Sequence, residues 1–112
     1  MWMSAYSLHG EMSPNAWTEF IKKLTLAIGM TPNGEPAAWQ YPTHCGAGGS
    51  GQTILQAITE SFIVIDTWPF HKGAYILICS CKPFELDPLY ALIREYKLEI
   101  VDGDHHRLKL AH

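Results

Sequence analysis

The chain has 112 residues, too few for two independent cores, so we expect one domain spanning residues 1–112. Hydrophobic residues make up 47% and charged residues 17%, which is typical of a packed globular protein and excludes a disordered or collagen-like chain. The formal net charge is −3 and the basic residues form no stripe, which disfavours nucleic acid as a partner.

The first half of the chain contains the clearest predicted helix, after a strand predicted over residues 2–8. Ser13 has the side chain of a helix cap, and Pro14 suits the first helical position. Gly29 is expected to end this helix, and residues 31–34 have the composition of a turn. The apolar residues at helical spacing are Trp17, Phe20, Ile21, Leu24 and Ile28.

Strands and a second helix are predicted for the rest of the chain. The segments rich in β-branched and aromatic residues are 37–41, 62–68, 74–81, 98–101 and 107–110. The second helix begins at Asp87, with Pro88 in its first turn, and its apolar stripe consists of Leu89, Leu92, Ile93 and Tyr96. Asp102-Gly103 lies between the last two segments and predicts a hairpin.

This order of elements predicts an α+β fold, a two-layer sandwich of a mainly antiparallel sheet with two helices on one face. In the segment 62–68, strand alternation places Asp66 on one face of the sheet together with Phe62, Val64 and Trp68. A carboxylate within an apolar strand is costly unless it is paired, and such positions cluster at functional sites. The alternative is an edge position where Asp66 faces solvent.

Membrane and metal sites are not expected. The longest apolar run, residues 74–79, is far below the roughly 20 residues of a spanning helix. No secretory signal is visible at the start of the chain, so we expect a cytoplasmic protein. The spacing of Cys79 and Cys81 is not that of a zinc or redox motif, and an odd count of three cysteines argues against a disulfide framework. His44-Cys45 and His105-His106 are adjacent pairs, and adjacent ligands seldom converge on one metal ion.

The glycine-rich segment 46–51 has the spacing of a dinucleotide fingerprint and also imitates a phosphate-binding loop. Gln52 stands where the phosphate-binding lysine would be. A dinucleotide fingerprint also needs a helix that starts in the glycines and an acid about 20 residues on, whereas residues 52–59 give at most two helical turns and the first acid beyond Glu60 is Asp66. We therefore interpret the segment as a flexible connection, or as a loop whose bare backbone lets a ligand approach closely.

From Gly51 to Cys81 the sequence resembles the bacterial S-adenosylmethionine decarboxylase family. That family has a glycine-rich turn, an apolar strand, a Glu-Ser-His cleavage site, His-Thr-Trp-Pro on the next strand and a later cysteine. The matching residues here are Gly51-Gln52-Thr53, Glu60-Ser61-Phe62, Asp66-Thr67-Trp68-Pro69 and Cys81.

The resemblance implies a self-processing enzyme of polyamine biosynthesis. The serine matching Ser61 attacks the carbonyl of Glu60, and elimination from the resulting ester leaves a pyruvoyl cofactor. That group holds the substrate amine and serves as an electron sink, while the cysteine matching Cys81 donates a proton. The implied substrate is S-adenosylmethionine, although Asp66 would also suit an amino acid with a cationic side chain.

Four positions depart from the family pattern. Phe62 and Asp66 replace histidines, Thr53 replaces a serine, and Phe70 replaces an acid. An imidazole accepts and returns a proton near neutral pH, whereas a carboxylate is normally ionised and a poor acid. A chain that does not process itself is similar to the phage-encoded S-adenosylmethionine lyases, which share the fold and use no cofactor.

The lyase interpretation is our first expectation, with methylthioadenosine and homoserine lactone as products. It makes Glu60 and Asp66 the carboxylates that orient the substrate, and Trp68 or Phe62 the aromatic face for the sulfonium or adenine. The alternative role of both aromatic residues is core packing. The decarboxylase and a non-enzymatic nucleoside-binding module are the other hypotheses. A sheet covered on one face leaves another surface to cover, so we expect a homo-oligomer, either a dimer or a trimer.

Overall fold

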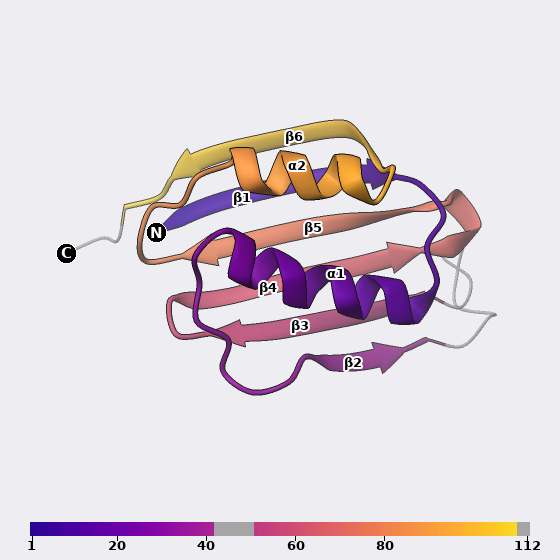
Figure 1. Ribbon diagram of the computed structural model, residues 1–112, viewed down its shortest axis with the longest axis horizontal. Coiled ribbons are helices and arrows are strands. Elements are labelled where there is room, and N and C mark those ends of the chain that lie inside the picture. The colour runs from indigo at the N-terminus through magenta and orange to yellow at the C-terminus, as the bar shows by residue number, and fades with distance from the viewer. Residues whose placement is uncertain (42–50, 110–112) are drawn as a thin grey trace.

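The structure is a computed structural model and describes residues 1–41 and 51–109 (Figure 1). Six strands, two helices and one short 3-10 turn follow one another along the described chain. In chain order they are β1 (Trp2–His9), α1 (Pro14–Ala27), β2 (Ala37–Gln40), β3 (Gln52–Ile58), β4 (Ser61–Trp68), the 3-10 turn η2 (Pro69–His71), β5 (Gly73–Ser80), α2 (Asp87–Glu95) and β6 (Glu99–Arg107).

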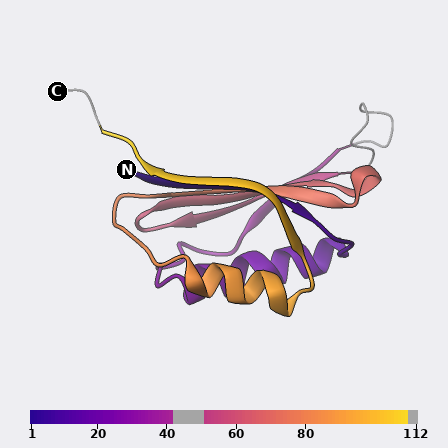
Figure 2. The ribbon, with the colours of Figure 1, turned by 90° about the horizontal axis from the view of Figure 1, so that it is seen from above.

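The six strands form one sheet in the order β2-β3-β4-β5-β1-β6, and every neighbouring pair is antiparallel. Both helices lie against the same face of this sheet, as the view in Figure 2 shows. The predicted α+β sandwich is therefore confirmed. The face without helices is called the open face below.

Helix α1 begins and ends where its sequence predicts. The Ser13 hydroxyl caps the first turn by accepting a hydrogen bond from the Ala16 N–H at 3.2 Å. Gly29 has a φ of 76°, a left-handed conformation that glycine adopts without strain and that stops the helix. Phe20, Ile21 and Leu24 are fully buried on the face toward the sheet.

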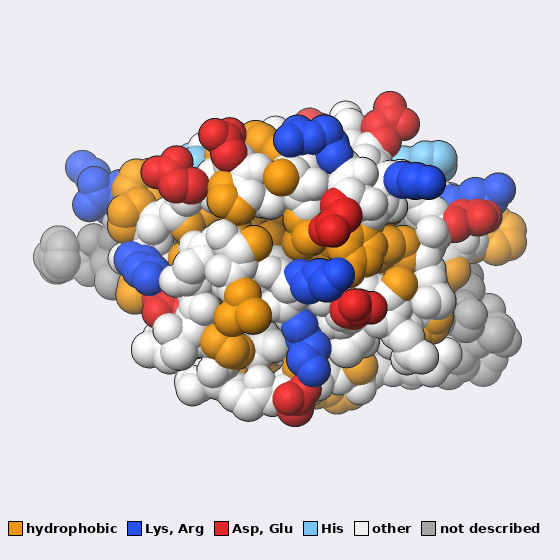
Figure 3. Space-filling model, in the orientation of Figure 1, with side chains coloured by type: hydrophobic (Ala, Val, Ile, Leu, Met, Phe, Trp, Pro, Cys, Tyr) orange, Lys and Arg blue, Asp and Glu red, His pale blue; other side chains and the backbone are white. Residues whose placement is uncertain are grey.

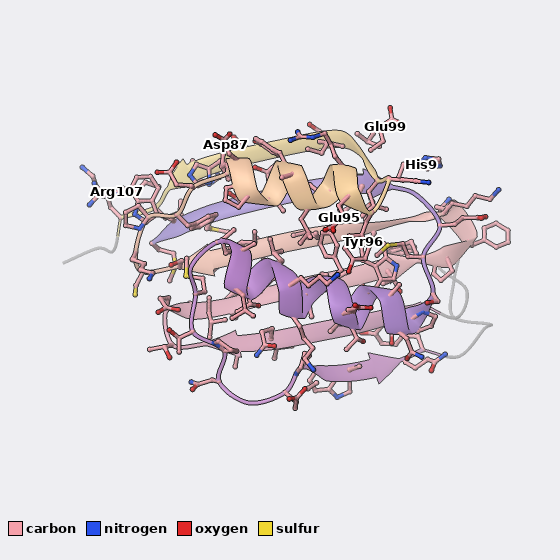
Figure 4. The ribbon with its side chains drawn as sticks, viewed as in Figure 1. His9, Asp87, Glu95, Tyr96, Glu99 and Arg107 are labelled. Carbon is pink, nitrogen blue, oxygen red and sulfur yellow. The ribbon has the colours of Figure 1, made fainter. Side chains whose placement is uncertain are left out.

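The core lies between the helices and the sheet. Leu89, Leu92 and Ile93 of α2 belong to the same buried cluster as isoleucines of the sheet, which are Ile54, Ile63, Ile65, Ile76 and Ile78. Tyr96 follows α2 and lies between the two helices (Figure 4), where its ring meets Phe20 edge-on at a centroid distance of 5.2 Å. The sheet face that carries these isoleucines is consequently the helix-covered face.

The predicted hairpin at Asp102-Gly103 is wrong, because both residues lie inside the single strand β6. Gly103 pairs with Tyr6 of β1, and a Cβ atom at position 103 would overlap the Tyr6 ring. The glycine therefore permits close contact with a ring instead of a turn. The pairing register of β1 and β6 shifts between Ser7 and Leu8. In Figure 4 the neighbours His9 and Glu99 lie at one end of this pair of strands, and Arg107 lies at the other.

The helix-covered side of the molecule carries charges of both signs intermixed over α1 and α2 (Figure 3). Two of its ion pairs are Lys22–Glu35 at 2.8 Å and Lys23–Glu19 at 3.6 Å. Neither described helix has the length and apolar composition needed to cross a membrane.

Candidate active site

One group of predicted site residues gathers at the end of the sheet where β3 turns into β4 and β5 ends, on the left of Figure 1. Glu60 belongs to the two-residue turn between these strands, and Ser61 is the first residue of β4. Ser61 pairs with Ser80, the last residue of β5. Cys81 therefore follows beside the Glu60–Ser61 peptide bond.

The carbonyl of Glu60 is held by a backbone donor. The Cys81 N–H donates a hydrogen bond to the Glu60 carbonyl oxygen at 2.9 Å. Such a donor polarises the carbonyl and stabilises negative charge that develops on its oxygen during a nucleophilic attack. The register of β4 and β5 thus brings Cys81 next to Glu60 and Ser61, from which it is distant in sequence.

The Glu60 carboxylate is turned toward the end of α1. Its Oε1 accepts a hydrogen bond from the Thr31 N–H at 3.0 Å, and its Oε2 lies 4.0 Å from the Lys82 Nζ. The hydrogen bond from the Thr31 N–H is the main reason that the pKa of Glu60 is lower than its ordinary value, and the charge of Lys82 lowers it further. The sequence analysis missed both partners, because nothing in the local sequence links residue 31 to the β3–β4 turn.

Cys79 lies within β5 and Cys81 directly follows it, and the two side chains differ in exposure. Cys81 is exposed, whereas Cys79 is buried opposite Phe62 of β4, and burial raises the pKa of the Cys79 thiol. Phe62 is half-buried on the open face. Of the two thiols, only that of Cys81 is accessible beside the Glu60–Ser61 bond.

A second group surrounds Asp66 on the open face. Asp66 Oδ1 accepts a hydrogen bond from the Thr53 hydroxyl at 3.2 Å, and Oδ2 accepts one from the Trp68 Nε1–H at 3.0 Å. The Thr53 hydroxyl also lies 2.7 Å from the hydroxyl of Tyr41. Asp66 is half-buried and shares the open face with Val64, as strand alternation predicts. Two side-chain donors therefore fix the orientation of this carboxylate.

These two groups are separated within one chain. Ser61 and Asp66 lie five residues apart on one extended strand, which corresponds to about 17 Å at roughly 3.3 Å per residue. The group of Glu60, Ser61 and Cys81 consequently does not meet Thr53, Asp66 and Trp68 in a single subunit.

A shallow depression of about 750 Å³ lies on the open face next to Asp66. Carboxylates and apolar side chains line it, including Asp66, Asp102, Asp104, Val64, Tyr75 and Leu77. None of the residues that line it is a lysine or an arginine. Its lining therefore suits a partly apolar ligand that carries positive charge.

Part of the glycine-rich segment, residues 46–50, lies outside the described residues, as do His44 and Cys45. Gly51 is described, and a Cβ atom there would overlap the carbonyl oxygen of Thr67. A glycine is required at this position by the neighbouring strand. Among the described residues, no three His, Cys, Asp or Glu side chains are placed to hold a metal ion.

Comparison with known proteins identifies the family and the fold. The sequence model of the S-adenosylmethionine decarboxylase family matches residues 10–103. The crystal structure of the adenosylmethionine decarboxylase from Aquifex aeolicus VF5 resembles the chain with a TM-score of 0.68 at 14% sequence identity. That likeness covers 100% of this chain and 93% of the Aquifex chain, and it shows the shared fold. No curated protein matches the sequence. Because the family match extends over most of the 112 residues, the chain belongs to the S-adenosylmethionine decarboxylase family.

Proposed function

We propose that the chain is a pyruvoyl-dependent decarboxylase of S-adenosylmethionine that cleaves itself between Glu60 and Ser61. Family membership supports the reaction class. The observation that carries the proposal is the Cys81 N–H donating to the Glu60 carbonyl oxygen at 2.9 Å, directly beside Ser61. This reverses the order of our sequence-based expectations, in which the cofactor-free lyase came first.

The self-cleavage proceeds by an acyl shift followed by elimination. The Ser61 hydroxyl oxygen adds to the Glu60 carbonyl carbon, the C–N bond breaks, and an ester forms. Loss of the Ser61 Cα proton then breaks the Cβ–O bond, which releases Glu60 as a free carboxylate. Water finally hydrolyses the bond between Cα and the nitrogen of residue 61. This step releases the nitrogen as ammonia and leaves a pyruvoyl group. During the first step the Cys81 N–H stabilises the charge on the carbonyl oxygen.

The residues around Ser61 fit a pyruvoyl group at position 61. A pyruvoyl group supplies an electron sink for the loss of carbon dioxide from an amino acid. Cys81 is exposed next to position 61, so its thiol is the group that would return a proton to the substrate carbon. Cys79 is buried and does not take this role.

A second copy of the chain completes the proposed site. Thr53, Asp66 and Trp68 lie about 17 Å from Ser61 on the same subunit, too far to act on the same reacting atoms. The open face exposes Trp39 and Tyr75, an apolar surface that a partner would cover. In a two-fold dimer through this face, Asp66 of the partner subunit would face the positive charge of the substrate bound near Ser61.

The cofactor-free S-adenosylmethionine lyase is the second candidate, and the environment of Asp66 favours it. Asp66 replaces the family's histidine, and its carboxylate is held by Thr53 and Trp68. A fixed carboxylate orients a cationic substrate well but exchanges protons poorly near neutral pH. In that reaction the substrate's own carboxylate displaces its thioether, so the protein supplies mainly the bound pose.

Incubation with S-adenosylmethionine labelled at its carboxyl carbon separates the candidates. The decarboxylase releases labelled carbon dioxide, whereas the lyase releases methylthioadenosine and retains the label in homoserine lactone. If the protein binds S-adenosylmethionine and releases neither product, the hypothesis of a non-enzymatic nucleoside-binding module is supported instead. A parallel incubation with amino acids that carry cationic side chains tests whether the substrate is S-adenosylmethionine, and carbon dioxide from those substrates alone would contradict that assignment.

A further inference from the structure

Lys82 directly follows Cys81 and has a fixed backbone. Its N–H donates to the Ser80 hydroxyl at 3.1 Å, and the same hydroxyl donates to the Lys82 carbonyl oxygen at 2.7 Å. Ser80 is fully buried. The start of the Lys82 side chain is therefore fixed relative to the Glu60–Ser61 bond across the strand pair.

The Lys82 ammonium group lies between two acceptors from different parts of the chain. Its Nζ donates to the carbonyl oxygen of Gly29 at 3.0 Å and lies 4.0 Å from Glu60 Oε2. Gly29 follows the end of α1, where free carbonyl groups carry partial negative charge. One cation thus connects the end of α1 to the turn that contains the cleavage site.

Thr31 adds a second connection between the same two segments. Its N–H donates to Glu60 Oε1 at 3.0 Å, and its carbonyl oxygen accepts the Thr59 N–H at 2.9 Å. The Glu60 side chain is only 11% exposed. Glu60 is therefore held by its side chain on the α1 side and by its carbonyl oxygen on the β5 side.

We propose that Lys82 is a positioning residue for self-cleavage, which acts by holding the Glu60 carboxylate and so fixes the Glu60 carbonyl in front of the Ser61 hydroxyl. The inference rests on the proposed self-cleavage. Lys82 touches neither the carbonyl nor the hydroxyl, so it acts on the rate through the orientation of the peptide bond. A half-exposed ion pair has a modest effect, and its loss is expected to slow self-cleavage about two- to fivefold.

The test measures the rate at which freshly purified full-length precursor splits. Lys82→Met removes the charge and should slow splitting, whereas Lys82→Arg keeps the charge and should restore most of the rate. Lys22→Met is the matched control, because Lys22 also pairs with a glutamate and its side chain is 51% exposed, against 50% for Lys82. The control should split like the wild type.

A double-mutant cycle identifies the route of the effect. If Lys82 acts through the Glu60 carboxylate, Glu60→Gln and the double variant Glu60→Gln/Lys82→Met should split at the same rate. Melting temperatures close to that of Lys22→Met would exclude general unfolding as the cause. A Lys82→Met precursor that splits at the wild-type rate overturns the role of Lys82 and leaves the self-cleavage standing. A wild-type chain that never splits overturns both.

Discussion

Individual residues beside the Glu60–Ser61 bond and around Asp66 have distinct chemical environments. Cys79 and Cys81 are two residues apart, yet one thiol is buried and the other is exposed. Glu60 and Asp66 are both carboxylates, yet Glu60 binds a backbone N–H and lies near Lys82, whereas Asp66 is held by two side-chain donors. These differences assign a separate role, and hence a separate test, to each residue.

The two thiols should respond differently to substitution. Cys81→Ala should lower the rate of carbon dioxide release about 100-fold or more, because a positioned acid contributes about that much to a rate. Cys79→Ala should lower the free energy of unfolding by about 1 kcal/mol through lost packing and keep the activity of the folded protein. Denaturant unfolding and product assays of both variants check this, and equal activity losses would contradict it.

Glu60 should link stability to pH. Its folded-state pKa is lowered below 4.5, so its ionised form stabilises the fold above that pH, and this stabilisation is lost as the pH falls through the lowered pKa. Glu60→Gln keeps an oxygen for the Thr31 N–H but cannot ionise. In a Ser61→Ala background, which keeps both chains uncleaved, urea unfolding should show Glu60→Gln less stable than the chain with Glu60 at pH 7, with the difference shrinking as the pH falls below 4.5. A difference independent of pH would be inconsistent with this role.

At the scale of elements, local sequence signals predict both helices but not the course of every strand. Ser13, Pro14 and Gly29 mark both ends of α1, because capping depends on neighbouring residues. Asp102-Gly103 predicts a turn that does not form, because the ring of Tyr6 that requires a glycine there comes from a distant strand. The contacts of Glu60 with Thr31 and Lys82 depend on strand register and on the path after α1, which no local pattern encodes.

Gly103→Ala tests the observed path of β6. The added methyl group would overlap the Tyr6 ring, so the variant should lose about 1–3 kcal/mol of unfolding free energy. Chemical denaturation of the variant and the wild type measures the loss. The overlap also predicts that Gly103→Ala costs less unfolding free energy in a Tyr6→Ala background than in the wild type. An equal cost in both backgrounds would contradict the contact between residue 103 and Tyr6.

At the scale of the whole molecule, the sequence predicts the sandwich, and the structure separates its site residues. Alternation along β4 correctly places Asp66 on the open face. The sequence analysis nevertheless treated Ser61 and Asp66 as one site, although about 17 Å of extended strand divides them. The dimer that we propose would join them across two chains, and the contacts between chains leave no visible pattern in a single sequence.

Subunit complementation tests the proposed dimer. Ser61→Ala and Asp66→Asn homodimers should each be inactive or strongly impaired. A mixed dimer carries one site with both wild-type residues, so random mixing should restore about one quarter of the wild-type activity. Assays on co-expressed variants, with each variant alone as the control, measure this. Activity that stays at the level of the single variants would place both residues in the same subunit's site or outside any site.

The most direct test of the central claim is the intact mass of the purified wild-type protein beside its Ser61→Ala variant. Self-cleavage predicts two fragments, residues 1–60 and 61–112, the second starting with a ketone that reacts with hydrazides, whereas the variant remains one chain. A wild-type protein that retains the full mass of 112 residues and still converts S-adenosylmethionine to methylthioadenosine would contradict the decarboxylase and establish the lyase.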